Sequence, residues 1–227
     1  MSMTSATQTL RVLARLLTYP DTEMRGQLCE MRDALHSEHA LDAARLAELD
    51  ALMEGLTRAD PLDAEAAYVQ LFDRGRATSL HLFEHVHGDS RDRGPAMIDL
   101  AQTYDQSGLH LAPDEVPDYL PAVLEFASTQ PPREARAFLG EMAHIFNALF
   151  SALQQRQSAY ASVIGALLEL AGEKAQTVTL PPEEQLDASW AEPPAFDGCS
   201  VKGQSGPDRP QPIRIVRKDN PAKGMPA

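Results

Sequence analysis

The residues best suited to chemistry gather in one short stretch, residues 79–94. Within it, His81-Leu82-Phe83-Glu84-His85 follows the H-x-x-E-H spacing of one group of zinc peptidases. On a helix, His81 and His85 would share a face as two zinc ligands, and Glu84 would serve as the base of a hydrolase. The spacing leaves a zinc-dependent hydrolase open, although a glycine follows closely and no third ligand is defined.

The last histidine of this stretch has a different setting. His87 precedes Gly88-Asp89, and Arg91 and Arg93 follow within six residues of it. We interpret these charged groups first as a polar network that orders a turn. No serine lies in a nucleophile elbow, and no glycine pattern fits a phosphate-binding loop. Apart from the zinc spacing, the sequence therefore predicts no catalytic residue and no bound cofactor.

A second stretch, residues 114–126, combines acidic and aromatic side chains. Glu125 lies beside Phe126, and Tyr119 precedes it by six residues. An apolar surface with negative charge suits a basic amphipathic peptide. Residues 73–125 carry ten acids and four arginines, a net charge of −6. The alternative is that the aromatic residues belong to the core and that Glu125 is a solvated helix residue.

Composition narrows the class of partner. The chain of 227 residues has a formal net charge of −13, which disfavours binding to nucleic acid and favours a cationic partner. Such charge also serves solubility alone. Cys29 and Cys199 fit neither a disulfide framework nor a zinc spacing. Since we find no signal peptide and no apolar run of membrane-spanning length, we expect a cytoplasmic protein without stable membrane insertion.

Apolar residues recur at spacings of three and four, which predicts helices. We expect them near residues 7–19, 24–36, 41–56, 61–72, 80–87, 90–107, 118–130, 134–155 and 160–171. No segment shows the alternation of a strand, so the predicted fold is all-α. We expect one helical-bundle domain over residues 1–178. Nine of the 17 prolines lie in residues 181–227, so residues 179–227 are predicted to form a flexible, disordered tail.

Three segments carry a family resemblance. They are Tyr68-Val69-Gln70-Leu71-Phe72, the stretch of residues 79–94 with Phe83-Glu84-His85-Val86-His87-Gly88, and Glu115-Val116-Pro117-Asp118-Tyr119-Leu120-Pro121 with the residues up to Phe126. Together they resemble the redox-enzyme maturation chaperones of the TorD/DmsD superfamily, and most closely the NarJ-type branch of nitrate reductase molybdenum cofactor assembly chaperones. The resemblance extends over about residues 8–172.

This resemblance implies a fold, a function and a partner. Such proteins are all-helical, are not enzymes, and bind the N-terminal segment of the nitrate reductase α subunit in its apo form. They hold it in the cytoplasm while molybdenum cofactor and an iron–sulfur cluster are inserted, before it docks on the membrane subunit. Molybdenum cofactor delivery proteins are further implied partners. The zinc spacing is then a coincidence.

The resemblance also implies a peptide-binding region. The Glu-x-Pro-Asp-Tyr motif and the residues near it would form a groove, supported by the charged turn that precedes it. The implied residues are Glu115, Pro117, Asp118, Tyr119, Glu125, Phe126, His87, Asp89, Arg91 and Arg93.

Two alternatives stay open besides the zinc hydrolase. A helical adaptor would bind the folded surface of a partner instead of an unfolded peptide. In addition, residues 211–217 alternate apolar and basic side chains, and the linker before them is long enough to reach much of a small domain. This segment is a candidate for folding back on the acidic region.

Overall fold

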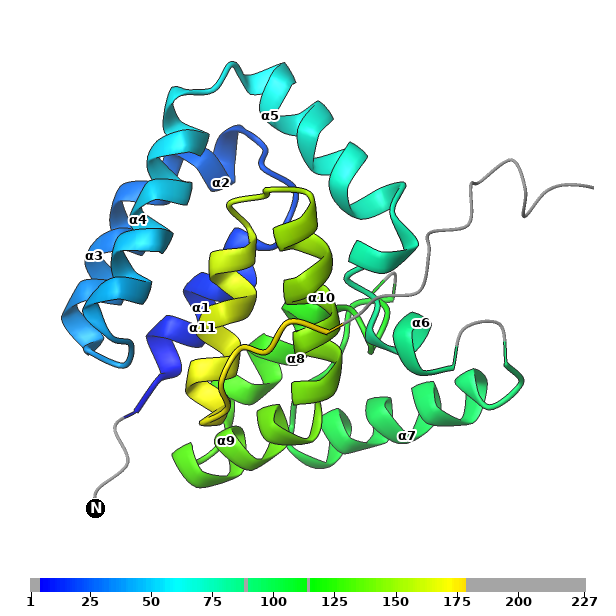
Figure 1. Ribbon diagram of the computed structural model, residues 1–227. Helices are drawn as coiled ribbons and strands as arrows, with labels where there is room; N and C mark the ends of the chain where they lie inside the picture. Colours follow the sequence, from blue (N-terminus) through cyan, green and yellow to red (C-terminus); the bar gives the residue numbers. More distant parts are fainter. Residues whose placement is uncertain (1–4, 88–89, 114, 179–227) are drawn as a thin grey trace, which may run out of the picture. The chain divides into compact units, whose positions relative to one another are not determined.

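The structure, a computed structural model, describes residues 5–87, 90–113 and 115–178 (Figure 1). Its regular elements in these ranges are helical, and an isolated antiparallel bridge pairs His81 with Tyr119. The elements are α1 (Thr7–Leu16), α2 (Thr22–Gly26), α3 (Leu28–Glu38), α4 (Ala43–Arg58), α5 (Pro61–Tyr68), the π-helix η1 (Val69–Asp73), the 3₁₀ helix η2 (Arg76–Thr78), α6 (Leu82–Val86), α7 (Arg93–Gln106), α8 (Leu120–Thr129), α9 (Pro132–Glu141), α10 (Ala143–Gln155) and α11 (Ala161–Ala171). The predicted all-α class is confirmed.

Two packed groups of helices build the core. In one, α1 packs against α8 and α3, and in the other, α11 packs against α10, α9 and α4 (Figure 1). Leu10, Leu13, Leu16 and Leu17 are buried, as their spacing on α1 predicts. Helices α6 and α7 belong to neither group and lie at the periphery.

Two predicted helices are each broken in the structure. The segment 24–36 divides at Gln27, where φ is −90° and ψ is −7°. The segment 134–155 divides at Met142, where φ is −93° and ψ is 1°. The predictions of single helices were wrong because the two halves contact different sets of neighbours. For example, α9 and α10 both contact α11, but α9 also contacts α8, whereas α10 also contacts α6 and η2.

Helix ends follow the sequence signals in some places only. Asp60 accepts a hydrogen bond from the Leu62 amide at 3.0 Å and Pro61 opens α5, at the start of the predicted range 61–72. Gly172 ends α11 with φ +81°, directly after the predicted range 160–171. Asp118 does not begin α8, because the helix starts two residues later and the Asp118 side chain turns into the interior.

The first helix is capped by a residue from another helix. The Glu38 carboxylate at the end of α3 accepts hydrogen bonds from the amides of Gln8 at 3.1 Å and Thr9 at 2.6 Å. The N-cap residue of this helix, Ala6, supplies no side-chain capping bond of its own. The tail of residues 179–227 and the candidate residue Asp89 lie outside the described residues.

Candidate functional site

The carboxylate of Asp118 is the centre of the candidate site. Its side chain is fully buried, yet its oxygens have partners. Oδ2 accepts a hydrogen bond from the Phe83 amide at 3.0 Å, and Oδ1 lies 3.3 Å from His81 Nδ1. The Asp118 carbonyl accepts a third bond, from the Leu82 amide at 3.0 Å. Asp118 thus satisfies the first two amides of α6, which explains how a buried carboxylate is tolerated.

Two more contacts join the stretches that the sequence singled out. The Leu120 amide donates to the Leu80 carbonyl at 2.9 Å, next to the bridge between His81 and Tyr119. The Tyr104 hydroxyl of α7 donates to the Pro117 carbonyl at 2.9 Å. The start of α6, the end of α7 and the start of α8 therefore meet at the dipeptide Pro117-Asp118.

Opposite charges surround this buried acid. Arg93 Nη2 lies 3.5 Å from Glu84 Oε1 and 3.8 Å from Asp118 Oδ2. The hydrogen bond to Asp118 raises the pKa of His81, an effect that burial of the imidazole opposes. We call Asp118, His81, Glu84 and Arg93 the Asp118 cluster. Its two basic side chains, His81 and Arg93, are about one-third exposed, so they connect the buried acid with solvent.

Aromatic contacts extend from this cluster into the core. The ring of Tyr119 lies 5.4 Å from the His81 ring, and its hydroxyl pairs with that of Tyr68. The Tyr68 hydroxyl also donates to the Leu17 carbonyl at 2.6 Å, and burial raises its pKa. The ring centroids of Tyr68 and Phe72 are 4.8 Å apart, and Tyr160 packs against both rings. The Tyr-x-x-Leu-Phe segment is thus part of the same network.

The structure divides the predicted peptide-binding residues into two groups. Phe126 is 4% exposed and packs between the rings of Tyr104 at 4.8 Å and Phe138 at 5.1 Å. Phe126 and Asp118 both belong to the interior. Neither would contact a bound peptide directly, and each would affect binding only by positioning the side chains around it. Glu115 and Glu125 are exposed.

The exposed acids of α8 and the preceding segment influence each other. Partial burial raises the pKa of Glu125 most, the charge of Glu115 raises it further, and Arg11 and Arg15 of α1 oppose the shift. Of the charged turn, the structure places Arg91 at the surface, and the His87 ring packs against Phe83 with 5.5 Å between centroids. Of the charged turn, Arg93 alone among the described residues belongs to the Asp118 cluster.

The zinc interpretation of the histidines does not match the local structure. His81 lies before α6 with φ −87° and ψ 105°, so His81 and His85 are not successive positions on one helical face. His85 Nε2 lies 2.8 Å from the Ser79 carbonyl oxygen, while His81 Nδ1 faces Asp118. Among the described residues, no three His, Cys, Asp or Glu side chains are arranged to hold a metal ion.

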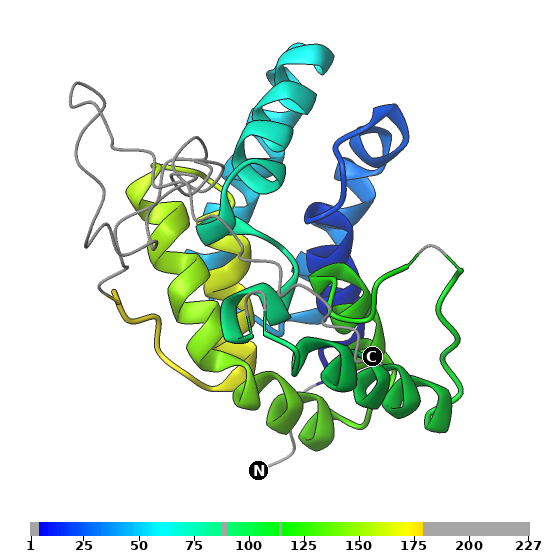
Figure 2. The ribbon, with the colours of Figure 1, turned by 90° about the vertical axis from the view of Figure 1, so that its right-hand side faces the viewer.

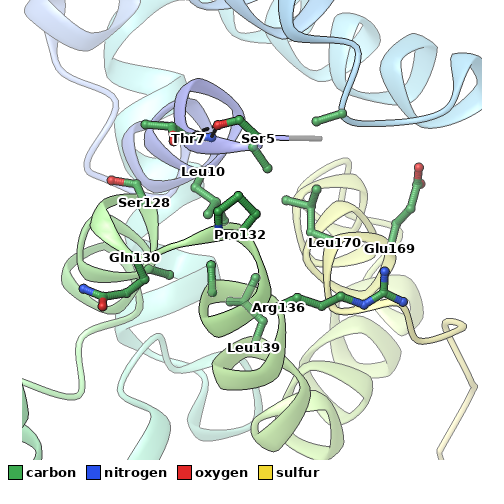
Figure 3. Close-up of a pocket in the computed structure, with 14 residues that line it drawn as sticks. Ser5, Thr7, Leu10, Ser128, Gln130, Pro132, Arg136, Leu139, Glu169 and Leu170 are labelled. Carbon is green, nitrogen blue, oxygen red and sulfur yellow. Dashed lines mark hydrogen bonds between the residues drawn. The ribbon is translucent and has the colours of Figure 1, made fainter. Parts of the chain in front are cut away.

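A cavity of about 370 Å³ lies away from this cluster, between the N-terminal end of α1, the C-terminal end of α8, α9 and α11. Figure 3 shows its apolar floor with Leu10 and Leu139, and the polar side chains of Gln130, Arg136 and Glu169 around it. None of the residues predicted to bind a peptide lines it.

The described residues also contain no helix long and apolar enough to cross a membrane.

The sequence does not single out Tyr104 or Tyr160, because no local pattern distinguishes them from other helix residues. His81 and Glu84 stand in the zinc spacing, which the family resemblance makes a coincidence, and the structure places them around Asp118.

Comparison with solved structures defines the fold. A crystal structure of a candidate redox enzyme maturation protein from Archaeoglobus fulgidus superposes with a TM-score of 0.52, covering 74% of this chain and 94% of that one at 18% identity. The chain therefore has the all-helical fold of this class of protein.

Sequence comparison identifies the family. The family model described as "Nitrate reductase delta subunit" matches residues 26–164, and the chain belongs to this family. It is 48% identical to the nitrate reductase molybdenum cofactor assembly chaperone NarJ of Escherichia coli K12, over 71% of this chain and 69% of that protein. It is 38% identical to the E. coli K12 protein named "Probable nitrate reductase molybdenum cofactor assembly chaperone NarW", over 82% of this chain and 81% of that protein. These relatives are named as chaperones and not as enzymes.

Proposed function

We propose that this protein is a cytoplasmic chaperone of nitrate reductase assembly. It binds the N-terminal segment of the apo α subunit and holds that subunit while molybdenum cofactor and an iron–sulfur cluster are inserted, before membrane docking. The observation that carries the proposal is the 48% identity to a protein named for this role in molybdenum cofactor assembly. The resemblance of residues 68–72, 79–94 and 115–126 to NarJ-type chaperones supplies the client segment.

The negative charge of the described surface is complementary to a basic client segment. Of the residues carried over for binding, Asp118 and Arg93 belong to the Asp118 cluster and the Tyr119 ring packs on that of His81. Glu115 and Glu125 expose carboxylates nearby along the chain. A net charge of −6 over residues 73–125 attracts a basic segment from a distance. Acidic groups at the rim raise the association rate, and apolar contacts slow dissociation.

Isothermal titration calorimetry with a synthetic peptide of the α-subunit N-terminal segment tests the proposal. The wild-type chain is expected to bind it, and affinity is expected to fall as salt rises because exposed charges are screened beyond about 10 Å at 0.1 M salt. Binding of the folded α subunit but not of the peptide would favour the adaptor alternative. No binding of either would refute the proposed function.

Charge reversal locates the surface involved. Glu125→Lys is expected to weaken peptide binding about three- to tenfold, because it replaces attraction by repulsion at an exposed position. Asp33→Lys is the matched control, since Asp33 is equally exposed but lies on α3. Equal affinities of the two variants would place the binding surface away from α8, provided that their helical circular dichroism is unchanged.

A further inference from the structure

The helix α7 is attached to the rest of the domain mainly at its two ends. Of its 14 residues only Tyr104 is buried, whereas seven of the 13 residues of α10 are buried. Near its start, Arg93 reaches Glu84 and Asp118. Near its end, Tyr104 donates to the Pro117 carbonyl. Figures 1 and 2 both show α7 along the edge of the described domain, beside α6.

Between these two attachments, α7 carries an apolar row. Arg93, Met97, Leu100 and Tyr104 recur at spacings of three and four, which places them on one face of the helix. Met97, Leu100 and the adjacent Ala101 are only half-buried. This face thus keeps apolar surface that no helix among the described residues covers completely. We call the row Met97, Leu100 and Ala101 the α7 surface.

Further large apolar side chains are exposed on α7 and on the segments that precede and follow it in the chain. Val86 at the end of α6 is 49% exposed, Ile98 of α7 is 59% exposed and Val116 of the following segment is 39% exposed. Large apolar side chains that gather with charged groups on a protein surface are typical of interaction sites. The acidic balance of residues 73–125 determines which kind of partner fits such a site.

We propose that the α7 surface receives the apolar side of a basic amphipathic helix, and that Arg93 occupies the place of a cationic client residue until the client arrives. The inference rests on the proposed function and adds to it the surface and the mode of recognition. A second copy of this chain is a poor occupant, because its own acidic residues would face the acids around α7. A basic helix brings the opposite charge and an apolar face together.

The distances around Arg93 are suited to such an exchange. Its guanidinium lies 3.5 Å from Glu84 and 3.8 Å from Asp118, longer than the roughly 2.7–2.9 Å of charge-assisted hydrogen bonds. A lysine or arginine of the client therefore displaces it at small cost. Asp118 stays in position meanwhile, because the Phe83 amide and His81 hold the carboxylate independently of Arg93.

Arg93→Gln tests the exchange with the synthetic α-subunit peptide as the probe. Removal of the competing cation is expected to tighten peptide binding about three- to tenfold, and Arg93→Lys is expected to restore the wild-type affinity. Arg133→Gln is the matched control, since it removes the same charge from an exposed position on α9, outside the residues implied in peptide binding. If Arg93→Gln binds no more tightly than Arg133→Gln, the exchange is refuted.

A second pair of variants tests the α7 surface itself. Leu100→Glu places a charge on the apolar row and is expected to weaken peptide binding at least about tenfold, since the charge must be desolvated in the complex. Gln102→Glu adds the same charge on the exposed side of α7 and is expected to bind like the wild type. Equal affinities of these two variants would overturn the assignment of the surface.

The outcomes separate this inference from the proposed function. If the wild type binds the peptide and the Arg93 and Leu100 variants bind it with the same affinity, the assignment of the α7 surface is refuted and the proposed chaperone function is not. Absence of binding by the wild type removes both. Hydrogen exchange of the wild-type chain supplies a readout that needs no variant, because a docked peptide is expected to slow exchange of the α7 amides, and unchanged exchange with peptide bound refutes the surface.

Discussion

Replacing Asp118 with asparagine tests whether one buried carboxylate holds α6 in place. In Asp118→Asn, the side-chain oxygen would still accept from the Phe83 amide, but the new amide group would face the imidazole of His81 and the guanidinium of Arg93. A hydrogen bond to a charged group contributes about 1.5–3 kcal/mol, and a partly exposed ion pair adds at most about 1 kcal/mol. We therefore expect Asp118→Asn to lower the free energy of unfolding by about 2–3 kcal/mol.

The alanine variant separates the loss of charge from the loss of the helix cap. Asp118→Ala leaves the buried Phe83 amide without its acceptor, which costs a further 1–3 kcal/mol or so. Urea unfolding monitored by far-ultraviolet circular dichroism measures both variants. Asp105→Asn is the control, because Asp105 also pairs with a histidine, His110 at 2.9 Å, but both side chains are exposed. It is expected to change stability by less than about 0.5 kcal/mol.

The pH dependence of the stability lost in Asp118→Asn gives a second check. Because Asp118 raises the pKa of His81 in the folded state, the stabilisation is fully present below the ordinary histidine pKa of about 6.5. It is lost as pH rises through the higher folded-state pKa. The difference between wild type and Asp118→Asn is therefore expected to be larger at about pH 5 than at about pH 9. A difference that is the same at both pH values, or no larger than that of the control, would refute this account of the cluster.

Two further predictions concern helix ends, and urea unfolding measures both. Glu38→Ala is expected to lower the free energy of unfolding by about 0.5–2 kcal/mol, because the amides of Gln8 and Thr9 lose their acceptor. Gly172→Ala is expected to cost about 1–2 kcal/mol because φ is +81° there. Gly140→Ala, inside α9 with open space around it, is expected to gain about 0.5–1 kcal/mol. The reverse order of the two glycine variants would contradict the assigned backbone conformations.

Local patterns were sufficient for much of the fold. The spacing of leucines on α1 and the Asp60-Pro61 start of α5 depend on residues within one or two turns, so the sequence reveals them directly. The breaks at Gln27 and Met142 depend on which neighbours each half contacts. Helical periodicity continues through both positions and does not mark them, and the glycines close to them, Gly26 and Gly140, are also tolerated inside helices.

The candidate site was predictable as a region and not as a set of contacts. Its two stretches stand out by residue type and by family resemblance, and the structure joins them at the bridge between His81 and Tyr119. Asp118 beside proline has the local signature of a helix cap. It does cap a helix, but the helix is α6, some 35 residues earlier in the chain. Only the tertiary structure decides which helix receives the carboxylate.

This distant cap has a consequence for the order of folding. A helix as short as α6, Leu82–Val86, does not form alone in water, because nucleation costs more than one turn returns. Its first two amides find their acceptors on Asp118, so these bonds require closure of a loop of some 35 residues. The site therefore forms only when α6 and the start of α8 are placed next to each other. A chain that exposes its hydrophobic core has no Asp118 cluster, so only the fully folded protein presents this site to a partner.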